Sequence, residues 1–456
     1  MTGAAPPRAT FRDVFGVREF RFLWSSVILS TAGDRLALVA LALLVYGRSR
    51  SPLLFALVLA AGYLPWVIGG LFLAELADRY PRRSVMVFCD AVRAVLVAAM
   101  VLPHMPIGAL IALLFVATMF APPFDSAKAS VTPDILQGER YVLGTAALQM
   151  TLLAGEVIGA VGGGVAVAFI GVRSSLAIDA FTFVLSGLFI GLGLQARPAA
   201  AKPESVQPSP LARMRGGFRL IFGDQALSTL LLFGWLVVFY TIPAGIAAPY
   251  VSRMGGGPIA TGLVIASTAL GTMIALPLFT RFVRPRQRIN LMGPLATLTC
   301  GALILIAFRP GLVASLVIFT LSAAFGVYQI AANTAFVVRV PNERRAQAFG
   351  IANMGVIVGQ GGGFIAAGAA AEVVNPAVVI AVSGAIGAVV AFVLTLRWRH
   401  VSPPGGRHAA GRRPGHAPVS RSVPLRESGC PRLGGYGQVH VSRIAHSPFG
   451  PRWRCM

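Results

Sequence analysis

The stretch Ala74-Glu-Leu-Ala-Asp-Arg-Tyr-Pro-Arg-Arg83 separates two long apolar segments of the chain. One carboxylate and three guanidinium groups fall within six of its residues: Asp78, Arg79, Arg82 and Arg83. Charged side chains at this density are costly inside hydrocarbon. The stretch therefore predicts a short polar loop that joins two membrane-spanning helices.

The composition of the whole chain agrees with this prediction. Of its 456 residues, 56% are hydrophobic and only 12% are charged, whereas soluble domains carry about 25% charged residues. The net charge is +23, but 11 of the 39 basic residues follow residue 396 and most others lie in short polar breaks. This distribution favours orientation of an integral membrane protein over nucleic-acid binding.

Apolar segments of 18 to 29 residues alternate with the polar breaks, and each can cross a hydrocarbon core about 30 Å thick. The sequence thus predicts an all-α integral membrane protein with twelve transmembrane helices. The expected spans are 20–46, 53–74, 84–102, 107–124, 142–170, 174–195, 226–251, 258–281, 290–308, 311–337, 346–371 and 376–397.

The Lys and Arg residues of the loops predict the orientation of these helices. With both termini in the cytoplasm, the cytoplasmic loops hold 17 basic residues and the opposite loops hold five. Basic residues are enriched on the cytoplasmic side of membrane proteins. Residues 1–19 lack the apolar core and cleavage site of a signal peptide. We expect a multi-pass protein of the plasma membrane with cytoplasmic termini.

A Pro-rich linker and a weak internal repeat divide the chain into two halves. Gly155, Gly159, Gly163 and Gly164 in the fifth span recur as Gly355, Gly359 and Gly363 two hundred positions later. The predicted regions are a cytoplasmic segment (1–19), a six-helix bundle (20–196), a linker with an amphipathic helix (197–225), a second six-helix bundle (226–397) and a disordered basic tail (398–456).

The opening loop resembles the signature of the major facilitator superfamily, G-x-L-x-D-R-x-G-R-R, with Ala74 and Pro81 in place of its two glycines. The resemblance covers roughly residues 12–400. It implies two pseudo-symmetric six-helix bundles that move around a central site. It also implies that Asp78, Arg79, Arg82 and Arg83 form a conformational latch.

The glycines of the fifth span resemble the signature of the drug and proton antiporters of this superfamily, G-x-x-x-G-P-x-x-G-G, with Ala160 in place of its proline. Gly33-Asp34 and the stretch 255–262 are similar to the secretion-effector and siderophore-exporter branch. Small residues at this spacing also let helices pack closely in lipid. The seven repeated glycines are therefore either packing residues or part of the coupling machinery.

Few charged residues fall at membrane depth. Asp34 and Glu156 lie about 20 Å into their spans at 1.5 Å per residue, and we expect one of them to exchange protons, with Asp34 ahead of Glu156. In the alternative, they and Arg35 form structural ion pairs. Asp34 and Arg35 point about 100° apart on a helix, so they need not pair with each other.

Two further charged residues, Asp90 and Arg93, are spaced to pair with each other along one helix face. Asp125 and Asp179 lie near span ends, where a solvated role is expected. Aromatic and amide side chains at mid-depth could line a cavity for an apolar or cationic ligand; these are Tyr63, Trp66, Phe239, Tyr240, Tyr328 and Gln360.

These features predict a transporter and not an enzyme. The chain has no G-x-S-x-G, H-E-x-x-H or P-loop motif, and its four cysteines have no paired or metal-binding spacing. We expect a monomer in the lipid bilayer that needs no cofactor or metal, binds no nucleic acid and exports small amphipathic molecules by using a proton gradient. Proton-coupled uptake of a nutrient and a non-transporting scaffold or sensor are the alternatives.

Overall fold

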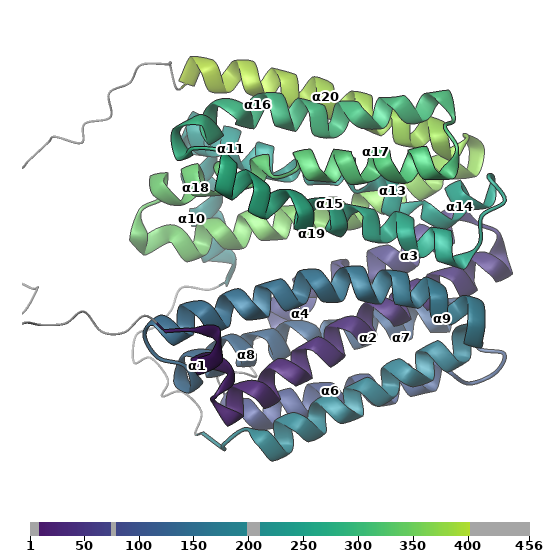
Figure 1. Ribbon diagram of the computed structural model, residues 1–456, viewed down its shortest axis with the longest axis vertical. Coiled ribbons are helices and arrows are strands. Elements are labelled where there is room, and N and C mark those ends of the chain that lie inside the picture. Colours follow the sequence, from purple (N-terminus) through teal and green to yellow (C-terminus); the bar gives the residue numbers. More distant parts are fainter. Residues whose placement is uncertain (1–8, 74–78, 198–209, 402–456) are drawn as a thin grey trace, which may run out of the picture. The chain divides into compact units, whose positions relative to one another are not determined.

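The computed structural model describes residues 9–73, 79–197 and 210–401, and every regular element in these ranges is a helix (Figure 1). Ten of these helices are long and apolar enough to cross a membrane. One of the ten, α9 (Glu139–Gly193), contains a break at Gly171, where φ is 80°, so it comprises two helical parts. The 19-residue helix α6 (Arg82–Met100) carries four charged residues. The count of twelve spans stays a prediction.

The N-terminal half contains long helices and two spans that are interrupted near their middle. The second span breaks after Ala61, before Pro65, and the fourth breaks at Phe120, before Pro122. Proline lacks the amide hydrogen that a continuous helix needs. The remaining elements of this half are α1 (Phe11–Phe15), α2 (Arg18–Ser49), α3 (Pro52–Ala61), α4 (Leu64–Phe72), α7 (Ile107–Met119) and α8 (Ala121–Ile135).

The C-terminal half follows α10 (Pro210–Gly223). Its first span is divided into four short helices around Pro243 and Pro249. The elements of this half are α11 (Gln225–Trp235), α12 (Val237–Tyr240), α13 (Ile242–Gly245), α14 (Ala247–Ser252), α15 (Pro258–Phe282), α16 (Pro285–Gly301), η1 (Ala302–Phe308), α17 (Leu312–Phe325), α18 (Tyr328–Arg339), η2 (Asn342–Arg344), α19 (Arg345–Val373) and α20 (Pro376–Val401).

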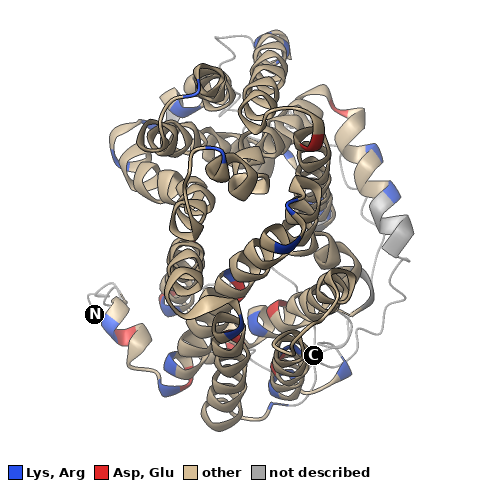
Figure 2. Cartoon of the chain, turned by 90° about the vertical axis from the view of Figure 1, so that its right-hand side faces the viewer, with Lys and Arg blue, Asp and Glu red and all other residues tan. Residues whose placement is uncertain are grey.

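Charged residues are sparse along these helices, and most of the ribbon in Figure 2 carries neither Lys and Arg nor Asp and Glu. Many large apolar side chains are nevertheless exposed, among them Phe169, Phe282 and Val389. Such a surface is unfavourable in water and suits contact with lipid.

The repeated glycines lie at close helix contacts in both halves. A Cβ atom on Gly159 would come 2.7 Å from the Ala32 carbonyl oxygen of α2, and one on Gly359 would come 2.6 Å from Val238 Cγ2 of α12. The other five also have atoms of a neighbouring helix within about 3 Å of such a Cβ: Gly155, Gly163, Gly164, Gly355 and Gly363. Six of the seven glycines therefore bring corresponding helices together in each half, α9 with α2 and α19 with α11 and α12, whereas Gly164 meets Pro258 of α15 in the other half.

Glu372 joins the two halves at the end of the bundle where α19 stops. Its Oε1 accepts hydrogen bonds from the Ser51 hydroxyl and from the Leu53 N–H, at 3.1 Å, and so covers the start of α3. Nearby, the hydroxyls of Tyr46 and Ser252 are 3.0 Å apart. We call these three contacts the Glu372 clasp.

Candidate functional site

A cavity of about 400 Å³ lies between the two halves. The N-terminal half supplies Arg35, Tyr63 and Glu156 to its wall. The C-terminal half supplies mainly neutral side chains, including Tyr240, Thr268, Thr272, Gln329, Gln360 and Phe364. This volume and this mixture of aromatic walls with a few polar groups are typical of small-molecule sites.

The charged part of the cavity is an ion pair between α2 and α9. Arg35 Nη2 lies 2.5 Å from Glu156 Oε1, and Arg35 Nη1 lies 3.5 Å from the Tyr63 hydroxyl. The guanidinium carbon is also 5.8 Å from the centre of the Tyr63 ring. Because both charged side chains are only partly buried, a ligand in the cavity can reach either of them.

The opposite wall is polar without being charged. Gln329 donates a hydrogen bond from Nε2 to the Tyr240 hydroxyl at 2.9 Å. Tyr63 and Phe364, from opposite halves, meet edge to face with ring centres 5.7 Å apart. The cavity thus offers charge on one side, and hydroxyl, amide and aromatic groups on the other.

Three of the six predicted cavity residues line this space: Tyr63, Tyr240 and Gln360. Trp66 lines a neighbouring cavity instead. Tyr328 is fully buried and donates its hydroxyl to the Phe233 carbonyl at 3.0 Å, and Phe239 packs against α20, with its Cβ 2.8 Å from where a Cβ on Gly387 would lie. The expectation for these two residues was wrong because depth along a helix does not specify the direction of a side chain.

The neighbouring cavity, of about 270 Å³, is lined by side chains of the N-terminal half, including Asp34, Arg35, Arg93 and Glu156. Arg93 of α6 forms an ion pair with Asp34 of α2. The guanidinium carbon of Arg93 also lies 4.2 Å from the centre of the Phe183 ring. The expected pairing of Arg93 with Asp90 is therefore replaced by a pairing between helices.

Asp90 and Asp179 are placed differently from expectation. Asp90 is fully buried and accepts a hydrogen bond from the Ser186 hydroxyl at 2.6 Å. Asp179 is 1% exposed, so the prediction of a solvated position near a span end was wrong. A carboxyl within an apolar helix is the signal that could have indicated a buried role.

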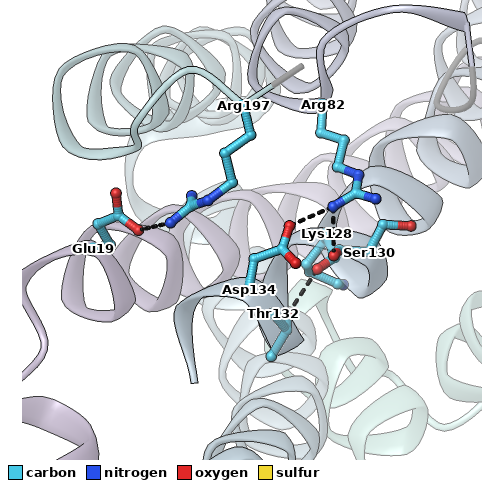
Figure 3. Close-up of polar contacts among 7 residues, drawn as sticks. All are labelled: Glu19, Arg82, Lys128, Ser130, Thr132, Asp134 and Arg197. Atoms are coloured by element: carbon cyan, nitrogen blue, oxygen red, sulfur yellow. Dashed lines mark hydrogen bonds and ion pairs between the residues drawn. The ribbon is translucent and has the colours of Figure 1, made fainter. Parts of the chain in front are cut away.

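The predicted latch is only partly described. Asp78 lies outside the described residues, and the next described range begins at Arg79. Arg82 pairs with Asp134 and donates to the Ser130 carbonyl at 3.0 Å (Figure 3). Arg83 donates to the Gly191 carbonyl. These arginines therefore attach the start of α6 to α8 and α9.

A second pair connects the two ends of the N-terminal half. Arg197 Nη2 lies 2.6 Å from Glu19 Oε2 (Figure 3). The other carboxylate oxygen of Glu19 accepts from the Gln195 N–H at 3.0 Å. Lys128 and Asp125 form a third pair within α8. The end of the bundle that holds these pairs, which we call the basic end, lies across the bundle from the Glu372 clasp.

Comparisons with known proteins show the family of this chain. The model of the Major Facilitator Superfamily matches residues 23–354. The uncharacterized MFS-type transporter YvqJ of Bacillus subtilis is 24% identical over 82% of this chain and 91% of its own length. The multidrug efflux pump Tap of Mycobacterium tuberculosis is 26% identical over 66% of this chain and 74% of its own length.

Among solved structures, a POT family transporter in complex with 5-aminolevulinic acid superposes with a TM-score of 0.67 at 11% identity. The match covers 87% of this chain and 99% of that one. The fold class expected from the sequence, an all-α membrane transporter fold, is thereby confirmed.

Proposed function

Since the chain belongs to the major facilitator superfamily, we propose that it is a secondary transporter that exports small amphipathic compounds in exchange for protons. The observation that carries this proposal is the cavity between the halves, where the Arg35–Glu156 pair faces a neutral polar and aromatic wall. Transporters of this kind bind their substrate at the interface of two repeats near the middle of the membrane.

The wall of the cavity favours an amphipathic cation as substrate. A ligand ammonium can replace the Arg35 guanidinium beside Glu156, since both are cations that pair with a carboxylate. The rings of Tyr63 and Phe364 attract a cation or stack with an aromatic ligand. Gln329, Tyr240 and Gln360 can bond neutral polar groups. The name of the relative Tap, a multidrug efflux pump, supports export of such compounds.

Proton coupling follows from competition for a carboxylate. A substrate cation at Glu156 frees Arg35 to neutralise another carboxylate of the N-terminal half, and that carboxyl group then releases its proton. Asp34, the first candidate from the sequence, precedes Arg35 on α2 and has its own guanidinium partner, Arg93; Glu156 is the second candidate. Export against a gradient then needs no nucleotide, cofactor or metal.

The direction of opening is inferred from the contacts between the halves. The Glu372 clasp holds one end together, so we propose that in this conformation the cavity is loaded from the basic end. We place that end and both termini in the cytoplasm, in a monomer within the plasma membrane. Rocking of the halves would break the clasp and release substrate outside.

Ethidium accumulation in cells tests this function, because ethidium is a fluorescent, aromatic cation. Cells that produce the protein should accumulate less ethidium than cells that produce an equal amount of the Glu156→Gln variant. Higher accumulation in cells with the unmutated protein than in cells with the Glu156→Gln variant would mean uptake. Unchanged accumulation of ethidium and of other amphipathic cations would favour a scaffold or sensor.

A further inference from the structure

Three carboxyl groups and one guanidinium meet where α2, α6 and the second part of α9 pack together. They are Asp34, Asp90, Asp179 and Arg93, and we call them the aspartate cluster. Arg93, 5% exposed, pairs with Asp34. Asp90 and Asp179 are 0% and 1% exposed. One cation therefore faces three buried or half-buried acids.

Hydroxyl groups accompany the two fully buried acids. The Ser186 hydroxyl donates to Asp90 Oδ2 and lies 2.7 Å from the Ser26 hydroxyl. The Thr182 hydroxyl donates to the Asp179 backbone carbonyl at 2.8 Å and lies 3.2 Å from Asp179 Oδ1. These are neutral partners, and they do not compensate a negative charge as a guanidinium does.

The charge balance points to protons in the cluster. A buried ion without a counter-ion costs several kcal/mol. The charge of Arg93 is already neutralised by Asp34, so Asp90 and Asp179 would lack a counter-ion if they were ionised. Two other titratable groups lie beside the cluster: Arg35, whose charge is paired with Glu156, and Cys89 of α6, whose thiol is neutral when protonated. α7 contributes only Leu114, Ala117 and Thr118 to the adjoining space.

We propose that Asp179 and Asp90 are both protonated in this conformation, and that Asp179 carries the transported proton and exchanges it. This deepens the proposed function and rests on it: Asp34 and Glu156, the coupling candidates, are each paired with an arginine here, so the protons are stored elsewhere.

Unsatisfied polar atoms independently mark the cluster as a binding site. Among the described residues, Asp90 Oδ1 and Arg93 Nε are buried and have no hydrogen-bond partner. Buried polar atoms are normally paired, and exceptions often belong to functional sites. An Asp90 that is protonated on Oδ1 presents a hydrogen and not a charge at that position, which lowers the cost of burial.

A route for exchange lies beside Asp179. A small space of about 20 Å³ is lined by Asp34, Arg93 and Asp179, and this volume holds one water molecule. Asp34 and Arg93 also line the larger cavity of about 270 Å³. A proton that leaves Asp179 therefore passes the Asp34–Arg93 pair to reach that cavity.

The exchange step balances without any redox partner. When substrate displaces Arg35 from Glu156, the freed guanidinium turns to the adjacent Asp34, and Asp34 releases Arg93. Arg93, still protonated, turns to Asp179. The O–H bond of Asp179 breaks, the proton passes to water in the cavity, and the new carboxylate pairs with Arg93.

Gly33 holds Asp179 within reach of this exchange. A Cβ atom on Gly33 would overlap Asp179 Oδ1 and Thr182 Oγ1. The carboxyl of α9 thus rests directly on the backbone of α2, one residue before Asp34. A movement of α2 therefore shifts the surroundings of Asp179 directly, because no side chain lies between them.

Infrared difference spectra between the purified full-length protein and its variants test the proposal without any substrate. A protonated carboxyl has a C=O stretch that is separate from the carboxylate bands and shifts in heavy water. We expect two such bands at neutral pH, one absent in Asp179→Asn and the other in Asp90→Asn. Asp224→Asn is the matched control, because asparagine also caps a helix well, and both bands should remain.

Thermal unfolding provides a second readout. Asparagine resembles a protonated aspartate, so Asp179→Asn and Asp90→Asn should keep the unmutated melting temperature. Asp34→Asn should lower it, because Arg93 loses the counter-ion that it has in this conformation and a protonated acid must ionise to replace it. Spectra of the unmutated protein without these bands, bands that persist in both variants, or a fall of the Asp179→Asn melting temperature as large as that of Asp34→Asn would overturn the proposal.

Flux measurements separate this proposal from the proposed function. In vesicles, Asp179→Asn should lose ethidium flux driven by a pH gradient and keep downhill ethidium exchange. If the unmutated protein moves no ethidium while both bands are present, export of this substrate class fails and the proton site stands. If Asp179→Asn keeps gradient-driven flux at the unmutated level, the proton site is refuted and export stands.

Discussion

Asp34 and Arg35 are consecutive residues of α2 whose side chains form ion pairs with two different helices. Asp34 pairs with Arg93 of α6, and Arg35 pairs with Glu156 of α9 at 2.5 Å. Because the Arg35–Glu156 pair faces the cavity between the halves, one dipeptide connects the proposed substrate site with the aspartate cluster.

The two ion pairs should differ in their contribution to stability. Asp34→Asn removes the counter-ion of the Arg93 guanidinium, whose side chain is 6% exposed. Asp179 must then ionise to replace it, and the cost is up to roughly 3 to 5 kcal/mol. Glu156→Gln leaves Arg35, which water reaches more easily at 28% exposure, so the loss should be clearly smaller.

Melting temperatures of the two purified variants measure this difference. Equal temperatures, or a larger loss for Glu156→Gln, would contradict the assignment of Arg93 as the more deeply buried partner.

Gly159 should be intolerant of a methyl group, whereas Gly162 should accept one. A Cβ on Gly159 would lie 2.6 Å from Arg35 Cβ, while one on Gly162 meets nothing within 4 Å. We expect Gly159→Ala to cost about 1 to 3 kcal/mol through overpacking. Gly162→Ala should be neutral or stabilise the helix by up to about 1 kcal/mol.

The measurement is thermal unfolding of both variants together with ethidium flux at equal protein amounts. The close contact of α9 with α2 would be refuted if the two alanine variants unfolded at the same temperature.

Removal of the Glu372 clasp should favour the conformation that is open at that end. Glu372→Gln weakens two hydrogen bonds to a carboxylate. Since the site is exposed, a shift of about 1 kcal/mol, about fivefold in population, is reasonable. Distances between spin labels at positions 50 and 253, measured by double electron–electron resonance, report this opening.

Arg173→Gln, which removes an exposed charge without touching the clasp, is the control and should leave the distance distribution unchanged. A distribution in Glu372→Gln that matches the unmutated protein would exclude the clasp as a gate.

Helix α1 should loosen in acid. Hydrogen bonds from the backbone N–H and the hydroxyl of Thr10 lower the pKa of Asp13. A lowered pKa in the folded state stabilises α1 above the ordinary carboxyl pKa of about 4, and this stabilisation is lost as pH falls through the lowered value.

A spin label at position 12 should therefore become more mobile below about pH 4. In Asp13→Ala it should be mobile at every pH. Mobility that does not depend on pH in the unmutated protein would show that the cap does not hold α1.

The sequence predicted the fold class correctly, because the length and apolarity of the spans are properties of the chain alone. It placed Asp34, Arg35 and Glu156 at similar depth, and it allowed Asp34 and Arg35 to pair with different helices. It could not choose the partners. Arg93 is three residues from Asp90, but it pairs with Asp34, which is 59 residues away along the chain.

The errors at Tyr328, Phe239 and Asp179 have one physical origin. Hydrophobic periodicity is weak in helices that are apolar all round, so the sequence does not indicate which face meets the cavity, the core or lipid. That face is set by packing between helices, as at Gly33, where the missing side chain admits the carboxyl of Asp179.

The most direct test of the central claim, exchange of an amphipathic cation for protons, is a flux measurement without an imposed gradient. Purified protein is reconstituted in vesicles that enclose a pH-sensitive dye, and ethidium is added outside. Antiport predicts that ethidium entry drives protons out, so the interior becomes alkaline, and that Asp179→Asn abolishes this change. Acidification of the interior, or ethidium entry without any change in pH, would contradict the account.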